Sequence, residues 1–377
     1  MKKIVILGST GSIGKNTLEV IRAFRDKFKV IALTAKQNIK ILENQIKEFQ
    51  PKYVAVLNSD AAAKLKKKIK NIEVFVGEDG IKYLLKLKNI DLIVNAIMGS
   101  AGLRYTYEAI KTGKIIALAN KESLVMAGKI VMKSAKKYKS SIVPIDSEHS
   151  ALFHLLHNKK PKEIEKIILT ASGGPFFRWK TIDLKNVTPW EALKHPVWRM
   201  GSKITVDSAT MLNKGFEIIE AHHLFNIDYD KIDVIIHPQS IIHSMVQIID
   251  GEIYAQLSPP DMKFPIINAL SFPEKLKNPF KRLSLEKIKK LSFEKPDYNK
   301  FPLLKYSYEI GKRGGNLPAA LTVADEIAVN LFLQRKIKFN QIFKLIKNIV
   351  ESVKFIKNPD IEDIFNTENY ILEKFNM

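Results

Sequence analysis

Short apolar runs that alternate with helical patterns constrain the first part of the chain more than any other feature. Runs rich in β-branched residues recur between residues 2 and 145, and helical spacing of apolar residues separates several of them. This alternation is typical of βαβ units, which build a mostly parallel sheet covered by helices. The sequence therefore predicts an α/β protein with an N-terminal, Rossmann-like doubly wound sheet. The predicted strands are 2–7, 29–34, 53–56, 73–76, 92–96, 115–118 and 142–145.

A glycine motif follows the first predicted strand directly. GSTGSIG occupies residues 8–14, and a helical pattern covers residues 16–24. Glycine lets backbone N–H groups and a helix N-terminus approach a pyrophosphate closely. Glycine loops also occur as plain tight turns, but the flanking strand and helix favour a dinucleotide site.

The end of the second predicted strand indicates which dinucleotide is bound. An NAD site usually has an acidic residue there, which accepts a hydrogen bond from the ribose 2′-hydroxyl. This chain has Lys36, Gln37 and Asn38 instead. Because a cation and two amides suit a 2′-phosphate, the sequence predicts NADPH.

Three carboxylates are candidate metal ligands. Asp146 ends an apolar run at the position where open α/β sheets bind ligands, and in an extended segment Glu148 would project to the same side. Glu217 lies in a second polar stretch, DSATMLNKGFE. A site made only of carboxylate oxygens suits magnesium or manganese rather than zinc. Acidic pairs are also common on solvated surfaces, so the spacing alone leaves both interpretations open.

The pattern changes after about residue 147. Two strand candidates, 241–249 and 252–257, flank the hairpin turn Asp250-Gly251. Apolar positions at helical spacing from residue 298 onward predict a small helical bundle. We therefore expect an NADPH-binding domain at 1–146, an α+β domain at 147–274, a linker at 275–297 and a C-terminal helical bundle at 298–377. In the α+β part, hydroxyls, an amide and a cation suited to a phosphate monoester come from Ser172, Ser208, Asn213 and Lys214.

Composition narrows the possible classes of protein. The formal charge of +22 is compatible with nucleic-acid binding, yet only eight of the 61 basic residues are arginine. Because readers of bases and phosphates favour clustered arginine, we interpret the charge as lysine bias on solvated faces. Nucleic-acid binding stays the alternative from another class. No run approaches the roughly 18 apolar residues of a membrane span, and no targeting peptide is evident, so we expect a cytoplasmic enzyme.

Several long motifs, in order along the chain, closely resemble the 1-deoxy-D-xylulose 5-phosphate reductoisomerase family. They are GSTGSIG, LANKESLV, PIDSEHSA, ASGGPF, HPVWRMGSKITVDSATMLNKGFEIIEA, IHPQSIIHSMV and QLSPPDMKFPI. The resemblance implies an NADPH- and divalent-metal-dependent rearrangement and reduction of a phosphorylated ketose. It also implies a homodimer whose subunits meet in the central domain, and hairpin 241–257 is where we expect the contact. The carbon skeleton rearranges by a retro-aldol/aldol or an α-ketol path, and the sequence does not choose between them.

The resemblance assigns roles to individual residues. It implies manganese or magnesium ligands at Asp146, Glu148 and Glu217, and catalytic roles for Lys121, Glu148 and Glu217. Trp198 falls in the family's mobile lid. Cofactor contacts are implied at Thr10, Gly11, Ser12, Ile13, Asn38, Asn120, Glu122 and Gly201. Substrate contacts are implied at Lys121, Ser147, Glu148, Ser172, His195, Ser208, Asn213, Lys214 and Glu217.

This chain departs from the family pattern after the second strand. Many members have a glycine and a basic residue there, whereas this chain has Lys36-Gln37, so Lys36 is our candidate contact for the 2′-phosphate. Among rival NADP enzymes, an aspartate-semialdehyde-type dehydrogenase needs a thiol nucleophile, and the chain has no cysteine. A homoserine-type dehydrogenase remains open.

Overall fold

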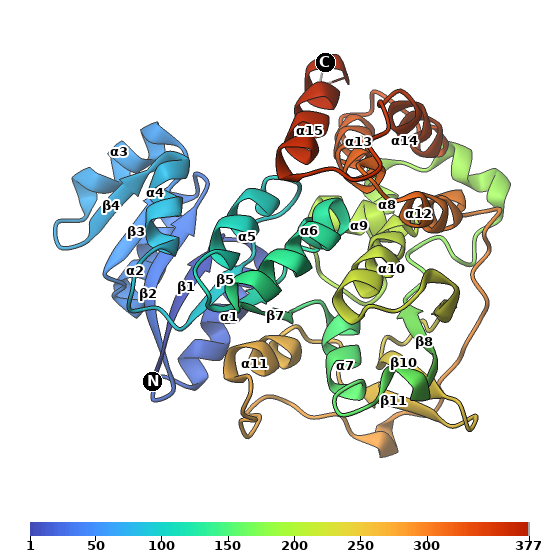
Figure 1. Ribbon diagram of the computed structural model, residues 1–377, viewed down its shortest axis with the longest axis horizontal. Helices are drawn as coiled ribbons and strands as arrows, with labels where there is room; N and C mark the ends of the chain where they lie inside the picture. Colours follow the sequence, from blue (N-terminus) through green and yellow to red (C-terminus); the bar gives the residue numbers. More distant parts are fainter. Residues whose placement is uncertain (376–377) are drawn as a thin grey trace. The chain divides into compact units, whose positions relative to one another are not determined.

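The computed structural model of the protein describes residues 1–375 and divides into two compact units (Figure 1). The first unit comprises residues 1–120, 131–150 and 261–280, and the second comprises 121–130, 151–260 and 281 onward. The segment 261–280 thus belongs to the first unit, although most of the second unit precedes it in the sequence. The expected division into four consecutive parts stays a prediction.

The first unit is built on a seven-stranded, fully parallel sheet with the strand order β4-β3-β2-β1-β5-β6-β7. Ile and Val dominate these strands, and residues 4–7 of β1 have no exposed surface. The strands are β1 (Lys2–Leu7), β2 (Phe28–Ala35), β3 (Tyr53–Val56), β4 (Glu73–Val76), β5 (Leu92–Asn95), β6 (Ile115–Leu118) and β7 (Ser141–Pro144). The predicted strands and the doubly wound α/β class are confirmed.

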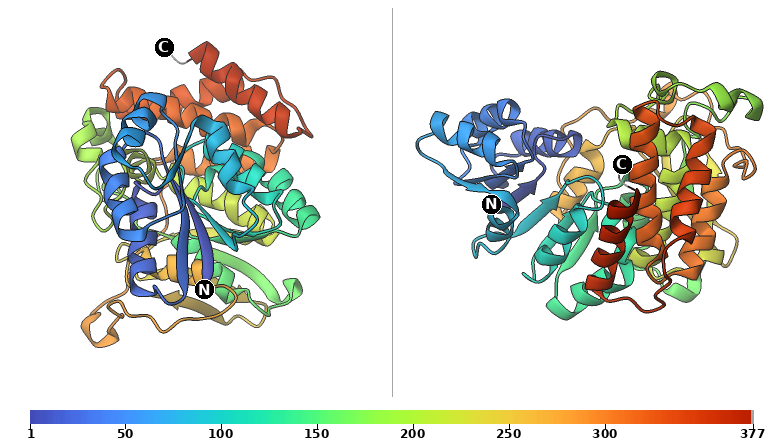
Figure 2. Two further views of the ribbon diagram at one scale, coloured as in Figure 1. Left: turned by 90° about the vertical axis from the view of Figure 1, so that its left-hand side faces the viewer. Right: turned by 90° about the horizontal axis from the view of Figure 1, so that it is seen from above.

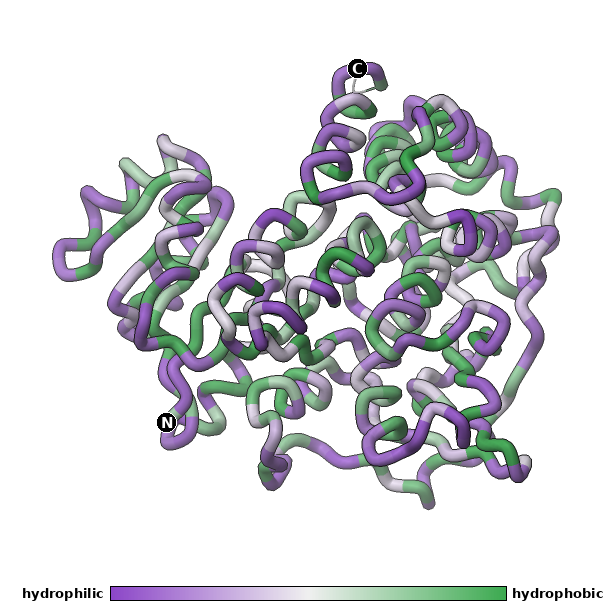
Figure 3. Tube along the Cα trace, in the orientation of Figure 1, coloured by the Kyte–Doolittle hydropathy of each residue, from purple (hydrophilic) through white to green (hydrophobic). Residues whose placement is uncertain are grey.

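Amphipathic helices connect the parallel strands. Around the turns of these helices, hydrophilic and hydrophobic residues alternate (Figure 3). Asn38 and Asn58 cap two of them, each accepting a hydrogen bond from a backbone N–H three residues later. The helices are α1 (Ser12–Ala23), α2 (Ile39–Phe49), α3 (Ser59–Lys68), α4 (Gly77–Leu85), α5 (Gly102–Ile110) and α11 (Lys263–Ser271). Helices α6 (Glu122–Tyr138) and α7 (Ser147–Leu155) include residues of both units.

The strand order places a ligand site at one edge of this sheet. The chain builds outward from β1 to β4 and then restarts on the other side of β1 with β5. Parallel sheets bind ligands at the carboxyl ends of the strands where the order reverses. The glycine motif begins at Gly8, immediately after β1, and therefore lies at this switch point.

The second unit combines a four-stranded sheet with a group of helices. The sheet has the order β11-β10-β8-β9, with β10 antiparallel to both neighbours and β8 parallel to β9. The predicted hairpin is confirmed as the β10–β11 pair. The strands are β8 (Ile164–Ala171), β9 (Ile232–Ile236), β10 (Ile242–Ile248) and β11 (Ile253–Leu257).

The helices of the second unit cover this sheet and form a bundle. In Figure 2, α12 to α15 run alongside one another, as predicted for the C-terminal region. The helices are α8 (Pro189–Ala192), α9 (Ser202–Ala209), α10 (Leu212–Phe225), α12 (Pro302–Arg313), α13 (Leu317–Leu333), α14 (Ile342–Glu351) and α15 (Ile361–Phe375). Short 3-10 turns lie at Pro161–Glu163, Thr181–Asn186, Tyr229–Lys231, Leu285–Lys287 and Phe339–Gln341. Within residues 1–375, no helix is long and apolar enough to cross a membrane.

Candidate active site

The glycine loop of the first unit has the backbone geometry of a phosphate cradle. Gly8 has a φ of +76°, and a Cβ at Gly14 would lie 2.4 Å from the carbonyl oxygen of Gly8. Only glycine, which has no Cβ atom, therefore fits at these two positions. Ser9 and Gln45 exchange two buried 2.8 Å hydrogen bonds, which fix the loop against α2. No side chain among residues 1–375 caps α1, which begins at Ser12 inside the motif, so its N-terminal turn faces an incoming anion with bare backbone.

The other expected cofactor residues of the first unit follow neighbouring strands at the same sheet edge. Lys36, Gln37 and Asn38 come after β2 and are exposed. The Asn38 carboxamide oxygen caps α2 by accepting from the backbone N–H of Ile41 at 3.2 Å, so it is already engaged. Asn120 follows β6, is 2% exposed and donates a 2.9 Å hydrogen bond to the carbonyl of Gly99. The unit thus places the loop, Lys36 and Asn120 after neighbouring strands at one edge of the sheet.

The segment around Asp146 is helical where we expected an extended strand. Strand β7 ends at Pro144 and α7 begins at Ser147, so the alternation argument for Asp146 and Glu148 is wrong. Asp146 instead caps α7: its Oδ1 accepts from the backbone N–H of Glu148 at 3.1 Å. The cap still brings the two acids together, because their carboxylate oxygens lie within 4.8 Å of each other. Ser147 donates a 2.6 Å hydrogen bond to Glu148, and buried His149 lies 2.9 Å from the Asp146 carboxylate.

In the second unit, Glu217 is the centre of a buried polar cluster. Lys121 Nζ donates to Glu217 Oε1 at 3.0 Å and to Asn213 Oδ1 at 2.9 Å. The Asn213 amide donates to the same Glu217 oxygen at 2.6 Å, and Lys214 binds the other oxygen. Asn213, Lys214 and Glu217 meet because they occupy one face of α10 at helical spacing, while Lys121 precedes α6. Two ammonium groups and one amide therefore converge on the Glu217 carboxylate.

A second pair, Ser172 and His195, lies where two loops meet. The Ser172 hydroxyl is 2.9 Å from His195 Nε2, while His195 Nδ1 accepts from the backbone N–H groups of Val197 and Trp198. Because Nδ1 accepts, the proton of the neutral ring belongs on Nε2, which then donates to Ser172. Burial lowers the pKa of His195 to about 4, so the ring is neutral at pH 7.

Ser208 is held next to the Ser172 loop by a close backbone contact. A Cβ built on Gly174, whose φ is +67°, would lie 2.5 Å from the carbonyl oxygen of Ser208. Gly201 forms the N-terminal boundary of α9, the helix that carries Ser208. Glu122 begins α6 directly after Lys121 and is buried. Every expected site residue of this unit is thus placed on α6, α9, α10 or the loops beside them.

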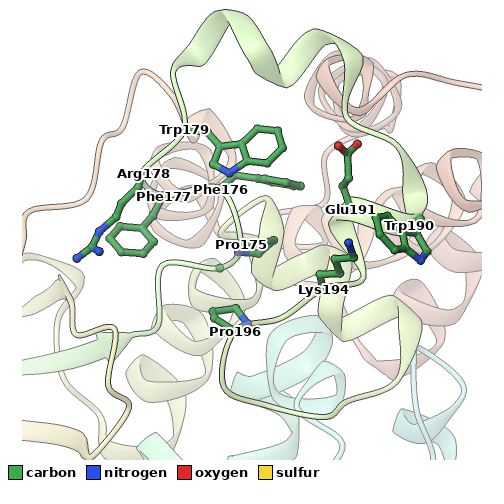
Figure 4. Close-up of a pocket in the computed structure, with 10 residues that line it drawn as sticks. Pro175, Phe176, Phe177, Arg178, Trp179, Trp190, Glu191, Lys194 and Pro196 are labelled. Atoms are coloured by element: carbon green, nitrogen blue, oxygen red, sulfur yellow. The ribbon is translucent and has the colours of Figure 1, made fainter.

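A cavity of about 390 Å³ lies beside the loop that begins with Ser172 (Figure 4). Its walls are formed by residues 174–179 and by residues from 190 to 196, with Trp179, Trp190 and Lys194 among the side chains drawn there. None of the expected substrate or metal residues lines it.

Models of one family match almost the whole chain. The model described as 1-deoxy-D-xylulose 5-phosphate reductoisomerase matches residues 4–128. Two models of C-terminal domains of the same enzyme match residues 142–225 and 257–373. The chain belongs to the 1-deoxy-D-xylulose 5-phosphate reductoisomerase family.

Individual members of the family align over their full length. The chain is 53% identical over 370 residues to a 1-deoxy-D-xylulose 5-phosphate reductoisomerase of Thermodesulfovibrio yellowstonii, covering 98% of this chain and 97% of that protein. It is 47% identical to the enzyme of Clostridium perfringens, with complete coverage of both. A solved DOX-P reductoisomerase in complex with NADPH, fosmidomycin and magnesium is 37% identical, with a TM-score of 0.95 and coverage of 100% and 98%. The Zymomonas mobilis enzyme in complex with NADPH is 39% identical, with a TM-score of 0.91 and coverage of 98% and 97%.

Sequence reasoning missed several polar residues of this chain that are wholly or partly buried. His149 supports Asp146, and its spacing of three residues from that acid was the available signal. Lys203 and Asp207 pair across one turn of α9, at the i,i+4 spacing that permits such a pair. Their third partner, Asp325, comes from α13, far away in sequence. No sequence pattern indicates that contact.

Proposed function

We infer that this protein catalyses the NADPH- and divalent-metal-dependent conversion of 1-deoxy-D-xylulose 5-phosphate to 2-C-methyl-D-erythritol 4-phosphate, in the non-mevalonate route of isoprenoid biosynthesis. The observation that carries this conclusion is the cluster of Lys121, Asn213, Lys214 and Glu217 in a chain of the reductoisomerase family. It combines a carboxylate that suits a hard cation with cations and an amide that suit a phosphate ester.

The residues of the chain fit the two groups that the reaction needs. Three carboxylates provide only oxygen ligands, and such ligands suit Mg²⁺ or Mn²⁺. The glycine loop is packed too closely for a Cβ atom, and a bare backbone of this kind suits a dinucleotide. When bound, the cation supplies a Lewis acid for the carbonyl and hydroxyl oxygens of the substrate, and NADPH supplies the hydride. The protein supplies binding, orientation and a controlled electrostatic environment.

We propose specific tasks for the residues of the metal and substrate site. Asp146, Glu148 and Glu217 hold the cation, and Lys121 donates hydrogen bonds that orient the reacting hydroxyls. Neutral His195 donates from Nε2 without adding a charge. The phosphate anchors an end of the substrate that does not react, so its binding energy helps to order the rest of the site. The substrate is bound through Lys121, Ser147, Glu148, Ser172, His195, Ser208, Asn213, Lys214 and Glu217.

We propose a second set of contacts for NADPH. The bare backbone of the glycine loop holds the pyrophosphate at the N-terminus of α1. Exposed Lys36 pairs with the 2′-phosphate, because no acid follows β2 to repel it. The proposed cofactor contacts are Thr10, Gly11, Ser12, Ile13, Lys36, Gln37, Asn38, Asn120, Glu122 and Gly201.

We also propose that two copies of the chain assemble through strand β11. This strand is an edge of the four-stranded sheet, and Ile249, Ile253 and Tyr254 near it are 68%, 54% and 41% exposed. An apolar edge strand is a ready pairing surface. Analytical ultracentrifugation tests this arrangement: we expect a dimer that Ile253→Lys converts to a monomer. A cytoplasmic location is consistent with the use of NADPH.

Turnover with purified protein tests the proposed function. We expect NADPH oxidation with 1-deoxy-D-xylulose 5-phosphate in the presence of Mn²⁺ or Mg²⁺, and its loss after chelation. Aspartate semialdehyde serves as the control substrate, because a homoserine-type dehydrogenase would reduce it with NADPH and needs neither a phosphate ester nor an added metal. Absence of turnover with the phosphorylated ketose at saturating metal would refute the assignment.

A further inference from the structure

A lysine whose side chain is 21% exposed joins two helices of the second unit through two buried carboxyl groups. Lys203 on α9 donates to Asp207 Oδ2 of the same helix at 2.7 Å and to Asp325 Oδ2 on α13. The side chains of Asp207 and Asp325 are 4% and 1% exposed. The contact joins positions 122 residues apart in the chain.

In this trio one lysine is shared by two buried carboxyl groups. The Oδ1 atoms of both Asp207 and Asp325 are buried with no hydrogen-bond partner among the described residues. Burial and the neighbouring Asp325 charge raise the pKa of Asp207 well above its usual range. Glu122 and Glu326 add further negative charge around Lys203. A buried arrangement of this kind costs desolvation energy, so packing alone does not explain it.

The trio touches the elements that carry the substrate residues. Asp207 immediately precedes Ser208, whose carbonyl packs against Gly174 in the loop that begins with Ser172. The Lys203 ammonium also lies 5.4 Å from the centre of the Phe216 ring on α10. Phe216 is 1% exposed and adjoins Glu217. One side chain therefore contacts α9, α10 and α13.

We infer that Lys203, Asp207 and Asp325 are positioning residues for the phosphate end of the substrate. They hold α9 against α10 and α13, and this fixes Ser208 relative to Asn213 and Lys214. The inference rests on the proposed function, since it concerns the same phosphate group. None of the three residues touches the reacting atoms; they act through Ser208.

Variants of Asp325 test the role directly. Asp325→Ala removes the anchor on α13, so we expect the KM for 1-deoxy-D-xylulose 5-phosphate to rise about tenfold, with a much smaller change in kcat, as for the loss of one charge-assisted hydrogen bond. Asp325→Asn keeps an oxygen that accepts from Lys203, and we expect it to restore KM to within about threefold. Lys347→Met, which breaks an exposed i,i+4 pair on α14, is the matched control and should leave KM unchanged.

Inorganic phosphate gives a readout that does not depend on turnover. Calorimetric titration of the full chain should show phosphate affinity weakened by the same factor in Asp325→Ala and restored in Asp325→Asn. A purely structural role would lower the melting temperature but leave KM and phosphate affinity unchanged in the folded enzyme, and that result overturns the inference. If Asp325→Ala does not fold, the same two measurements on Lys203→Met decide in the same way. A wild type that binds phosphate without turning over the ketose would refute the proposed function alone.

Discussion

Protonation of His195 should make the stability of the protein depend on pH. In an unfolded chain a histidine has a pKa near 6.5, whereas burial lowers the pKa of His195 to about 4 in the folded protein. Between these values the unfolded chain binds the extra proton and the folded chain does not, so stability falls as the pH falls through this window. At pH 5 the difference corresponds to a loss of about 2 kcal/mol relative to pH 8. Because the ring is only partly buried, solvent screening reduces the expected loss to about 1–2 kcal/mol.

Replacement by a group that does not titrate isolates this contribution. In His195→Asn the carboxamide oxygen can still accept from the backbone N–H groups that bind Nδ1. Urea unfolding at pH 8 and pH 5 provides the assay. All three tryptophans lie between residues 179 and 198, so their fluorescence reports on this region.

For each protein, the quantity to compare is the difference between its free energies of unfolding at pH 8 and at pH 5. The absolute free energy at either pH does not decide the test. We expect the variant to lose about 1–2 kcal/mol less than the wild type. His157→Asn, at an exposed position, is the matched control. Burial also lowers the pKa of His223, to about 3. Wild type and His195→Asn both retain His223, so both should lose some stability at pH 5 from this second histidine. Equal losses in wild type and His195→Asn would refute the argument.

Three further outcomes test the metal, the cofactor preference and the glycine loop. Glu217→Gln should abolish turnover while calorimetry shows NADPH binding within about twofold of wild type, because the change removes a ligand of the hard cation and leaves the proposed NADPH contacts intact; wild-type rates at low Mn²⁺ would remove Glu217 from the metal site. Lys36→Glu should lower the ratio of kcat/KM for NADPH over NADH by about ten- to a hundredfold, since it replaces attraction to the 2′-phosphate by repulsion; an unchanged ratio would place discrimination elsewhere. Gly14→Ala should raise the KM for NADPH at least about tenfold, because its Cβ would lie 2.4 Å from the Gly8 carbonyl, and normal NADPH kinetics would contradict the cradle.

Features that repeat locally along the chain were predictable from the sequence. The strands of the parallel sheet and the β10–β11 hairpin followed from apolar periodicity and turn residues, since each depends on near neighbours. Asn213, Lys214 and Glu217 could be expected to share a face, because three- and four-residue spacing has that effect on any helix. Gly174 shows what such local patterns do not predict. The glycine motif can be recognised in the sequence, but its contact with Ser208 depends on the tertiary structure.

Prediction from the sequence was wrong or incomplete where a capping interaction or a residue distant in the sequence determines the structure. The segment after β7 continued as a helix because Asp146 caps it, a choice that apolar alternation cannot reveal. The pairing of Lys203 with Asp325 depends on how α9 and α13 pack, and no local pattern specifies it. The inclusion of residues 261–280 in the first unit likewise depends on tertiary contacts alone.

The late position of α11 in the sequence has a consequence for how the protein folds during its synthesis. When residues 1–150 have emerged from the ribosome, every strand of the parallel sheet has been synthesised. Helix α11, which packs against α1, β6 and β7, has not yet been synthesised. The Lys2 ammonium, which donates to the carbonyls of Leu270, Ser271 and Phe272, still lacks all three partners at that stage. We therefore expect the N-terminal sheet to remain incompletely packed on the ribosome until residue 280 has emerged. Nascent chains arrested before and after α11 should differ sharply in resistance to protease.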